Sequence, residues 1–192
     1  SEQLIEFGKL DPFQPGYLGA SWPQSLGVFG DGRAAMILAF ENVGPNQAKN
    51  AGDGKGLDLD NIGRFAFPAV EGGAGKNTDT LGGINAWAVT KNASPEALAF
   101  VTFLTNADNE KKMAEAGMIL PVAVGAESGV VQPLLAQSAQ ALGASTWHQN
   151  YFDQTLGAAV GRVVNDVSVE LVSGQMSAQD AVDQIQEAME LR

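Results

Sequence analysis

The sequence predicts an α/β layer architecture. Three short apolar runs bounded by turn residues, 34–40, 62–67 and 84–89, are typical of buried strands. Segments in which apolar residues recur at helical spacing lie between and after these runs. Because expected strands alternate with helices and the chain ends in helices, we expect a short β-sheet flanked by helices, with a helical C-terminal tail.

Capping residues mark where several helices should begin. Ser21 is followed three residues later by Gln24, which forms a capping box with the start of a helix. Ser94 precedes a proline at the first helical position, a pairing that is common at helix N-termini. Asn106 and Ser177 also stand immediately before helical apolar patterns. We therefore expect a helix to follow each of these four caps.

Apolar spacing predicts three further helices. A short one lies near Gln47, and another spans residues 130–142. A long helix is indicated over residues 152–171 and closed by Gly174. Asp153 would open this long helix, where the helix dipole favours a carboxylate.

Composition excludes several classes of function. The 192 residues include 22 Asp and Glu against 11 Lys and Arg, so the formal net charge is −11. Such a chain lacks the clustered basic residues that nucleic-acid binding requires. It contains no Cys, which excludes disulfides and thiolate chemistry, and its single His148 cannot form a multi-histidine metal site. We expect no cofactor, no metal and no nucleic-acid partner.

An ordered set of short segments carries a family resemblance. These segments are Gly19–Trp22, Phe29 with Gly32–Met36, Phe65 with Phe67–Gly73, Leu81–Gly83, Ala88 with Val89, Phe100 with Phe103–Thr105, Leu120–Val122, and Gln149 with Tyr151–Asp166. In this order and at these spacings, the chain resembles the C-terminal half of an extracellular solute-binding protein of a carbohydrate ABC importer. The resemblance is strongest to the branch that binds xylosides, cellobiose and related plant oligosaccharides.

The resemblance implies a fold and a function. The fold is the C-terminal portion of a two-lobed, periplasmic-binding-protein-like structure that closes about a hinge. The function is to capture an oligosaccharide outside the membrane and deliver it to ABC permease subunits, without catalysis. The protein would be extracellular or periplasmic, either soluble or membrane-associated as a lipoprotein. We expect an N-terminal lobe, absent from this sequence, or a partner chain to complete it.

The resemblance also divides the chain into three segments. Residues 1–83 would form the C-terminal-lobe and hinge segment that contains the strands. Residues 84–121 would cross over and pack on the N-terminal lobe, and residues 122–192 would form the C-terminal helical segment. An apolar stripe that includes Leu98 and Phe103 would then need the other lobe to cover it.

Sugars present apolar C–H faces and a rim of hydroxyl groups, so their sites combine aromatic rings with carboxylates and amides. The candidate ligand-binding residues are Trp22, Glu41, Asn42, Gly83, Asn85, Trp87, Trp147, Gln149, Tyr151 and Asp153. The family commonly places a Trp where this chain has Asn42, and an Asp where it has Asn85. Either Phe40 or Trp22 supplies the missing ring, or the ligand is smaller. In the family, an acidic residue at the position of Asp153 faces the sugar.

The sequence is also compatible with two other functions. Glu41 and Asp153 are carboxylates that a glycoside hydrolase could use as a pair, although the sequence gives no distance between them. The chain could also be a non-catalytic interaction module that completes another protein. Chemical turnover of an oligosaccharide would distinguish the hydrolase from a reversible binder.

Overall fold

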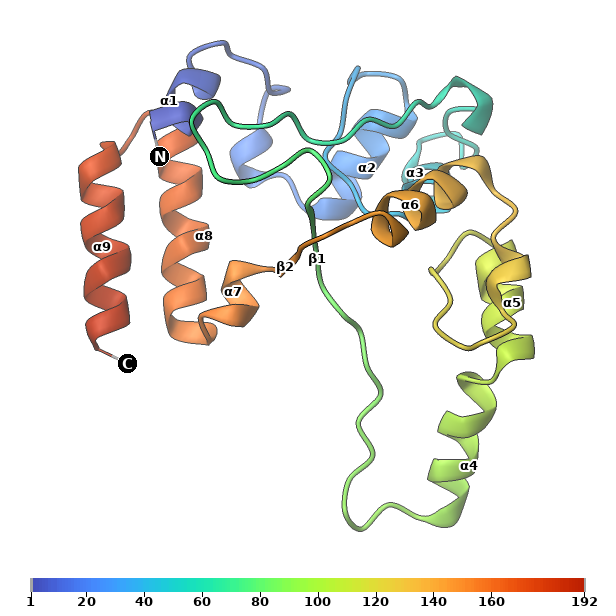
Figure 1. The fold of residues 1–192 in the computed structure, drawn as a ribbon. Coiled ribbons are helices and arrows are strands. Elements are labelled where there is room, and N and C mark those ends of the chain that lie inside the picture. The colour runs from blue at the N-terminus through green and yellow to red at the C-terminus, as the bar shows by residue number, and fades with distance from the viewer. Residues whose placement is uncertain (1, 192) are drawn as a thin grey trace. The chain divides into compact units, whose positions relative to one another are not determined.

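The computed structural model describes residues 2–191 and is rich in helix (Figure 1). Its helices are α1 (Glu2–Gly8), α2 (Trp22–Gly30), α3 (Val43–Asn50), α4 (Pro95–Leu104), α5 (Ala107–Glu115), α6 (Pro133–Gly143), α7 (Phe152–Thr155), α8 (Ala158–Val172) and α9 (Ala178–Glu190). Short 3-10 turns are η1 (Tyr17–Gly19), η2 (Leu59–Asn61) and η3 (Glu127–Gly129). Strands β1 (Thr80–Gly82) and β2 (His148–Asn150) form a two-stranded parallel sheet. The α/β class predicted by the sequence is confirmed.

The chain folds as two compact units. The first contains residues up to Ala20, residues Leu81–Gly83 and residues from Gln149 onward. The second contains Ser21–Thr80 and Ile84–His148. The chain therefore passes from the second unit to the first within each of the two strands. Among the described residues, no helix is long and apolar enough to cross a membrane.

The first unit is built around the packing of α8. Val167 and Leu171 of α8 are buried together with Ala181 of α9. Ile5 of α1 and Ile185 of α9 pack against this cluster. Figure 1 shows α8 and α9 side by side. Of the apolar side chains at helical spacing on α9, Ala181 and Ile185 therefore lie against the core, whereas Val182 and Met189 are exposed.

The second unit depends on the close packing of α2 against α3. A Cβ atom on Gly27 would lie 2.6 Å from the backbone oxygen of Asn50, so only glycine lets the helices come this close. Gln47 of α3 is completely buried, and its amide both donates to and accepts from the backbone of Leu57 at 2.9 and 2.8 Å. These two bonds satisfy a buried polar side chain and hold the loop that follows α3.

A buried carboxylate fixes the turn after α5. One oxygen of Glu110 accepts hydrogen bonds from the backbone N–H groups of Val122 and Ala123, each at 2.7 Å. Burial of a charge is costly unless such partners are present, so this contact orders the chain beyond α5.

The helix caps confirm the predictions made from local sequence. The side chain of Gln24 accepts from the backbone N–H of Ser21 at 2.7 Å, as a capping box requires. The side chains of Ser94, Asn106 and Ser177 each accept a backbone N–H of the first turn that follows. The short helix near Gln47 is α3, and the helix predicted over 130–142 is α6, which begins at Pro133.

The three predicted strands are wrong as strands. Residues 34–40, 62–67 and 84–89 are extended but belong to neither strand of the sheet. Their apolar side chains are exposed, with 80% of the surface of both Leu38 and Ile84 accessible. A strand needs a neighbouring backbone to pair with, and an apolar run alone does not supply one.

The long helix predicted over residues 152–171 is also wrong in its extent. It is divided into α7 and α8 at Gly157, whose φ of 81° lies in the left-handed region where a helix cannot continue. The backbone of Asp153 in α7 lies so close to Gly161 of α8 that any Cβ there would overlap it. Asp153 therefore belongs to the short helix α7 and does not open the long one.

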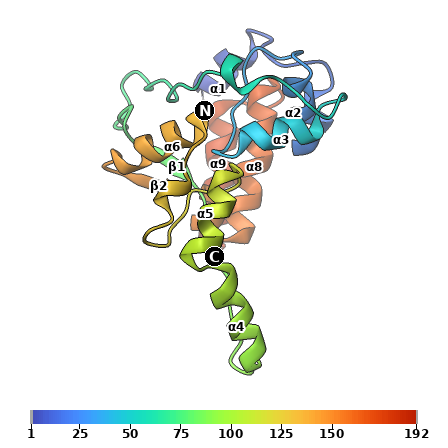
Figure 2. The ribbon, with the colours of Figure 1, turned by 90° about the vertical axis from the view of Figure 1, so that its right-hand side faces the viewer.

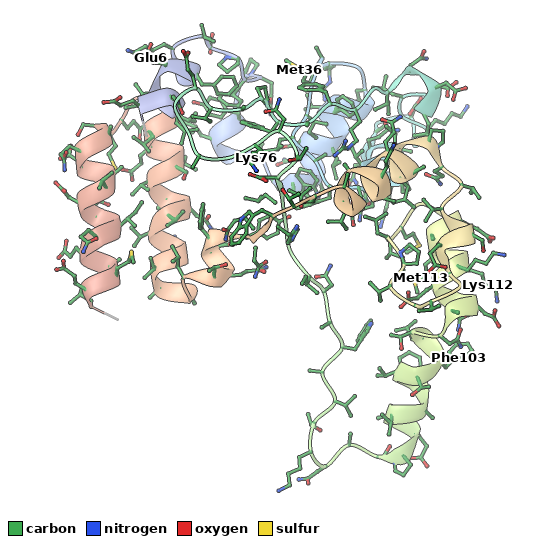
Figure 3. The ribbon with its side chains drawn as sticks, viewed as in Figure 1. Glu6, Met36, Lys76, Phe103, Lys112 and Met113 are labelled. Atoms are coloured by element: carbon green, nitrogen blue, oxygen red, sulfur yellow. The ribbon has the colours of Figure 1, made fainter. Side chains whose placement is uncertain are left out.

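Helix α4 lies outside the packed core of its unit. It contains no buried residue, although apolar side chains lie on several of its sides. Figures 1 and 2 show it projecting away from α2, α3 and α6, and Figure 3 labels Phe103 on it, near Lys112 and Met113 of α5. A helix that is apolar all round is normally buried, so this surface needs a partner.

Replacing Gly27 by alanine should destabilise the second unit. Alanine favours a helix over glycine by about 0.5–1 kcal/mol, but overpacking against Asn50 should cost about 1–3 kcal/mol. Urea unfolding followed by circular dichroism would measure the net loss. Gly143→Ala is the control, because Gly143 has open space around it. A Gly27→Ala variant at least as stable as the control would contradict this packing.

The exposed apolar surface of α4 should make the chain associate with itself. Light scattering should give a mass above the 20.0 kDa of one chain, rising with concentration. Phe103→Asp should reduce this association because it places a charge on the surface. Val182→Asp, at an exposed position of α9, should not. If the measured mass equals that of one chain at every concentration, the apolar surface of α4 does not cause self-association, which would contradict this prediction.

Candidate functional site

The ten candidate ligand-binding residues are distributed over both units. Those in the first unit are Gly83, Gln149, Tyr151 and Asp153. Those in the second unit are Trp22, Glu41, Asn42, Asn85, Trp87 and Trp147. Each unit thus contains at least one candidate residue with an aromatic ring, one with an amide and one with a carboxylate.

In the first unit, the parallel pairing of β1 and β2 brings Gly83 and Tyr151 together. Gly83 directly follows β1, and Tyr151 directly follows β2. A Cβ atom on Gly83 would lie 2.8 Å from Cε2 of Tyr151 and 3.6 Å from Nε2 of Gln154. Both residues stand at the carboxyl ends of parallel strands, which is where open α/β sheets bind their ligands.

Gln154 is a site candidate that our sequence prediction missed. It lies on α7, three residues after Tyr151, and its side chain shares the surroundings of Gly83. The spacing of three residues on a helical turn is the signal that could have found it, because such residues lie on one face. The ring of Tyr151 and the amide of Gln154 therefore form one group.

The side-chain amide of Gln149 donates a hydrogen bond to the backbone of the next residue, Asn150. Its Nε2 donates to the backbone oxygen of Asn150 at 2.7 Å, and the hydroxyl of Thr155 donates to the same oxygen at 3.3 Å. Within the described residues, the side-chain oxygen of Asn150 is buried without a hydrogen-bond partner. Gln149 would have to break its local bond before Nε2 could reach a ligand.

Asp153 lies in the first turn of α7 and is exposed. No hydrogen bond joins its side chain to another residue of the described range 2–191 in this structure. Its carboxylate is therefore accessible to solvent on the same short helix as Gln154. A carboxylate in this position can accept hydrogen bonds from solvent or a ligand.

In the second unit, Trp22 and Phe40 form an exposed aromatic pair. Their ring centroids are 5.4 Å apart and the ring planes meet at 66°, an edge-to-face arrangement. Their exposed fractions are 39% and 47%. Glu41 and Asn42 follow Phe40 directly, and the side chain of Asn42 makes no capping bond to α3. The ring pair is thus followed directly in the chain by a carboxylate and an amide residue.

The remaining candidates are exposed. Trp87 and Asn85 lie on the extended segment before α4, and 64% of the surface of Trp87 is accessible. Trp147 precedes β2 and is similarly exposed, while its backbone oxygen accepts from the N–H of Thr80 at 3.0 Å. In the described structure these side chains are not part of the core.

A chain of hydrogen bonds beside Trp147 determines the tautomer of His148. The Ser145 hydroxyl donates to the oxygen of Trp147 at 2.6 Å, which uses its single hydrogen. For the 3.1 Å contact between the Thr80 and Ser145 hydroxyl oxygens to be a hydrogen bond, Thr80 must then be its donor. Its oxygen is then left to accept from Nδ1 of His148 at 2.9 Å. The proton of the neutral imidazole thus belongs on Nδ1.

This tautomer can be tested by nitrogen-15 NMR of the imidazole. We expect the neutral ring of His148 to carry its proton on Nδ1, leaving Nε2 as a hydrogen-bond acceptor. Thr80→Val removes the accepting oxygen and should release this preference, while Thr90→Val on the exposed segment should not. A neutral ring protonated on Nε2 in the unaltered chain would contradict the hydrogen-bond assignment.

Two carboxyl groups have shifted pKa values, and neither belongs to the candidate site. Backbone N–H groups of Gly56 and Lys55 hold the pKa of Asp53 below its usual value. Its own backbone N–H and the hydroxyl of Ser94 lower the pKa of Glu96 at the start of α4. Both shifts arise from turn and helix-terminus geometry. Residues 2–191 contain no cluster of three or more acidic or histidine side chains suited to a metal ion.

Comparison with known proteins identifies the family to which the chain belongs. The sequence matches the family of bacterial extracellular solute-binding proteins over residues 5–111, which is more than half of the chain. The chain belongs to this family. Its members are binding proteins, not enzymes; they are components of ABC transporters, act outside the cell or in the periplasm, and pass a bound solute to a permease. No curated protein matches the chain.

Proposed function

We propose that this solute-binding chain takes up carbohydrate, specifically oligosaccharides of the xyloside or cellobiose type. The observation that carries the proposal is the exposed Trp22–Phe40 pair, which Glu41 and Asn42 follow directly in the chain. Aromatic rings pack against the apolar C–H faces of a sugar, while adjacent carboxylates and amides bind its hydroxyl groups. Phe40 compensates here for the tryptophan that the resembling family has in place of Asn42.

The group in the first unit supports the same proposal. The Tyr151 ring offers a second apolar face, and Gln154 and Asp153 add an amide and a carboxylate on the adjacent helical turn. Because these groups stand at the carboxyl ends of two parallel strands, they occupy the position where α/β folds place ligands. The net charge of −11 favours a neutral solute over an anionic one.

We further propose that an N-terminal lobe, on the same or another chain, completes the cleft and covers residues 84–121. Support comes from the exposed apolar side chains of this segment, such as Ile84, Leu98 and Phe103. The division into segments 1–83, 84–121 and 122–192 belongs to this proposal. ABC permease subunits would then receive the sugar from the two-lobed protein, which would be either soluble or held by a lipid anchor.

Calorimetry with short xylo-oligosaccharides and cello-oligosaccharides tests the sugar assignment. We expect reversible binding, weak in the isolated chain and stronger once both lobes are present. Chromatography of the sugars afterwards should recover them intact. Cleaved products would support the alternative of a glycoside hydrolase using Glu41 and Asp153. Binding of an unrelated solute class with no response to any sugar would contradict the proposal.

Replacing Asp153 by alanine should weaken binding in the two-lobed protein that we propose. The loss should be about 1.5–3 kcal/mol, the value of a hydrogen bond to a charged group. Asp166→Ala is the control, because Asp166 is an exposed carboxylate of the first unit that pairs with Arg162 on the same helix at 2.8 Å. Calorimetry would measure both variants. A lower melting temperature with unchanged affinity would mean that Asp153 has a purely structural role.

A further inference from the structure

Gly83 makes a contact that no other residue type could make. A Cβ atom there would lie 2.8 Å from Cε2 of Tyr151, closer than Cβ atoms approach other atoms in proteins, and 3.2 Å from Cδ2, which is a tight contact. The φ of Gly83 is outside the left-handed region, so the backbone itself would accept an alanine. The space occupied by the Tyr151 ring, and not backbone strain, is what requires glycine at this position.

The backbone of Tyr151 cannot move away to relieve such a clash. Its oxygen accepts the N–H groups of Gln154 at 3.0 Å and Thr155 at 2.8 Å, which begins helix α7. The close approach of Asp153 to Gly161 in turn holds α7 against α8. A side chain at residue 83 would therefore have to displace the ring of Tyr151, and the amide of Gln154 lies within 3.6 Å of the same position.

We propose that Gly83 is a positioning residue, which binds no sugar itself but sets the orientation in which the Tyr151 ring receives one. The proposal rests on the function proposed above, that this site binds an oligosaccharide. Contact with the bare α-carbon supports one edge of the ring, from Cδ2 to Cε2. It also keeps the ring and the Gln154 amide in a fixed relation, so that one sugar unit meets an apolar face and a hydrogen-bonding group together.

The first experiment measures the ring itself, without sugar. The chain contains two tyrosines, so nitration by tetranitromethane followed by peptide mass spectrometry reports each one separately. Gly83→Ala should change the nitration rate of Tyr151 several-fold and leave that of Tyr17, which stacks on Phe13 at 4.6 Å, unchanged. Gly19→Ala is the matched control in the same unit, because no atom lies within 4 Å of a Cβ there. An unchanged rate at Tyr151 would overturn the proposal.

The second experiment measures binding of a cello-oligosaccharide or xylo-oligosaccharide by ligand-observed NMR titration. Gly83→Ala should weaken binding by about tenfold, the upper value of a lost aromatic contact. It should have no further effect in a Tyr151→Ala background, because the ring through which it acts is gone. An equal loss in that background would overturn the proposal by showing that Gly83 acts independently of Tyr151.

These outcomes separate the two proposals. If the unaltered chain binds none of the sugars, the proposed function fails, while the nitration rates still decide whether Gly83 positions the ring. If Gly83→Ala does not fold, the double variant Gly83→Ala/Tyr151→Ala decides instead. Recovery of folding in the double variant would support the contact, and continued failure to fold would contradict it.

Discussion

The parallel pairing of β1 with β2 is the interaction on which the candidate site depends. The strands are only three residues long, but they join segments that are far apart in the chain. The hydrogen bond from Thr80 to Trp147 fixes their register, and this register places Gly83 beside Tyr151. The chain changes from the second unit to the first within both strands. Without this pairing, nothing would hold Gly83 close to the ring of Tyr151 and the amide of Gln154.

A second constraint is how little apolar surface the chain buries. The cores are small, formed by α1, α8 and α9 in one unit and by buried residues of α2, α3, α5 and α6 in the other. Helix α4 and three extended apolar segments remain accessible. Hydrophobic burial is the main force that stabilises folded proteins, so a chain with this much exposed apolar surface gains stability from a partner.

Local features could be predicted from the sequence, while features that depend on distant contacts could not. Ser94, Asn106 and Ser177 cap their helices as expected, because a cap requires only the next few residues. The strands expected at 34–40, 62–67 and 84–89 failed because pairing depends on a partner that hydrophobicity does not specify. The break at Gly157 was missed because the apolar spacing continues across it. For the site, the aromatic candidates were found by residue type, but the contacts of Gly83 with Tyr151 and Gln154 follow from the register of the sheet.

The most direct test of the central claim is a backbone-amide NMR titration of the chain with a cello-oligosaccharide or xylo-oligosaccharide. This method detects weak binding and assigns it to residues. The account predicts shifts concentrated at Gly83, Tyr151 and Gln154 in one unit, and at Trp22 and residues 40–42 in the other. Shifts confined to surfaces remote from both groups, such as α9, or no shifts at high sugar concentration, would contradict it.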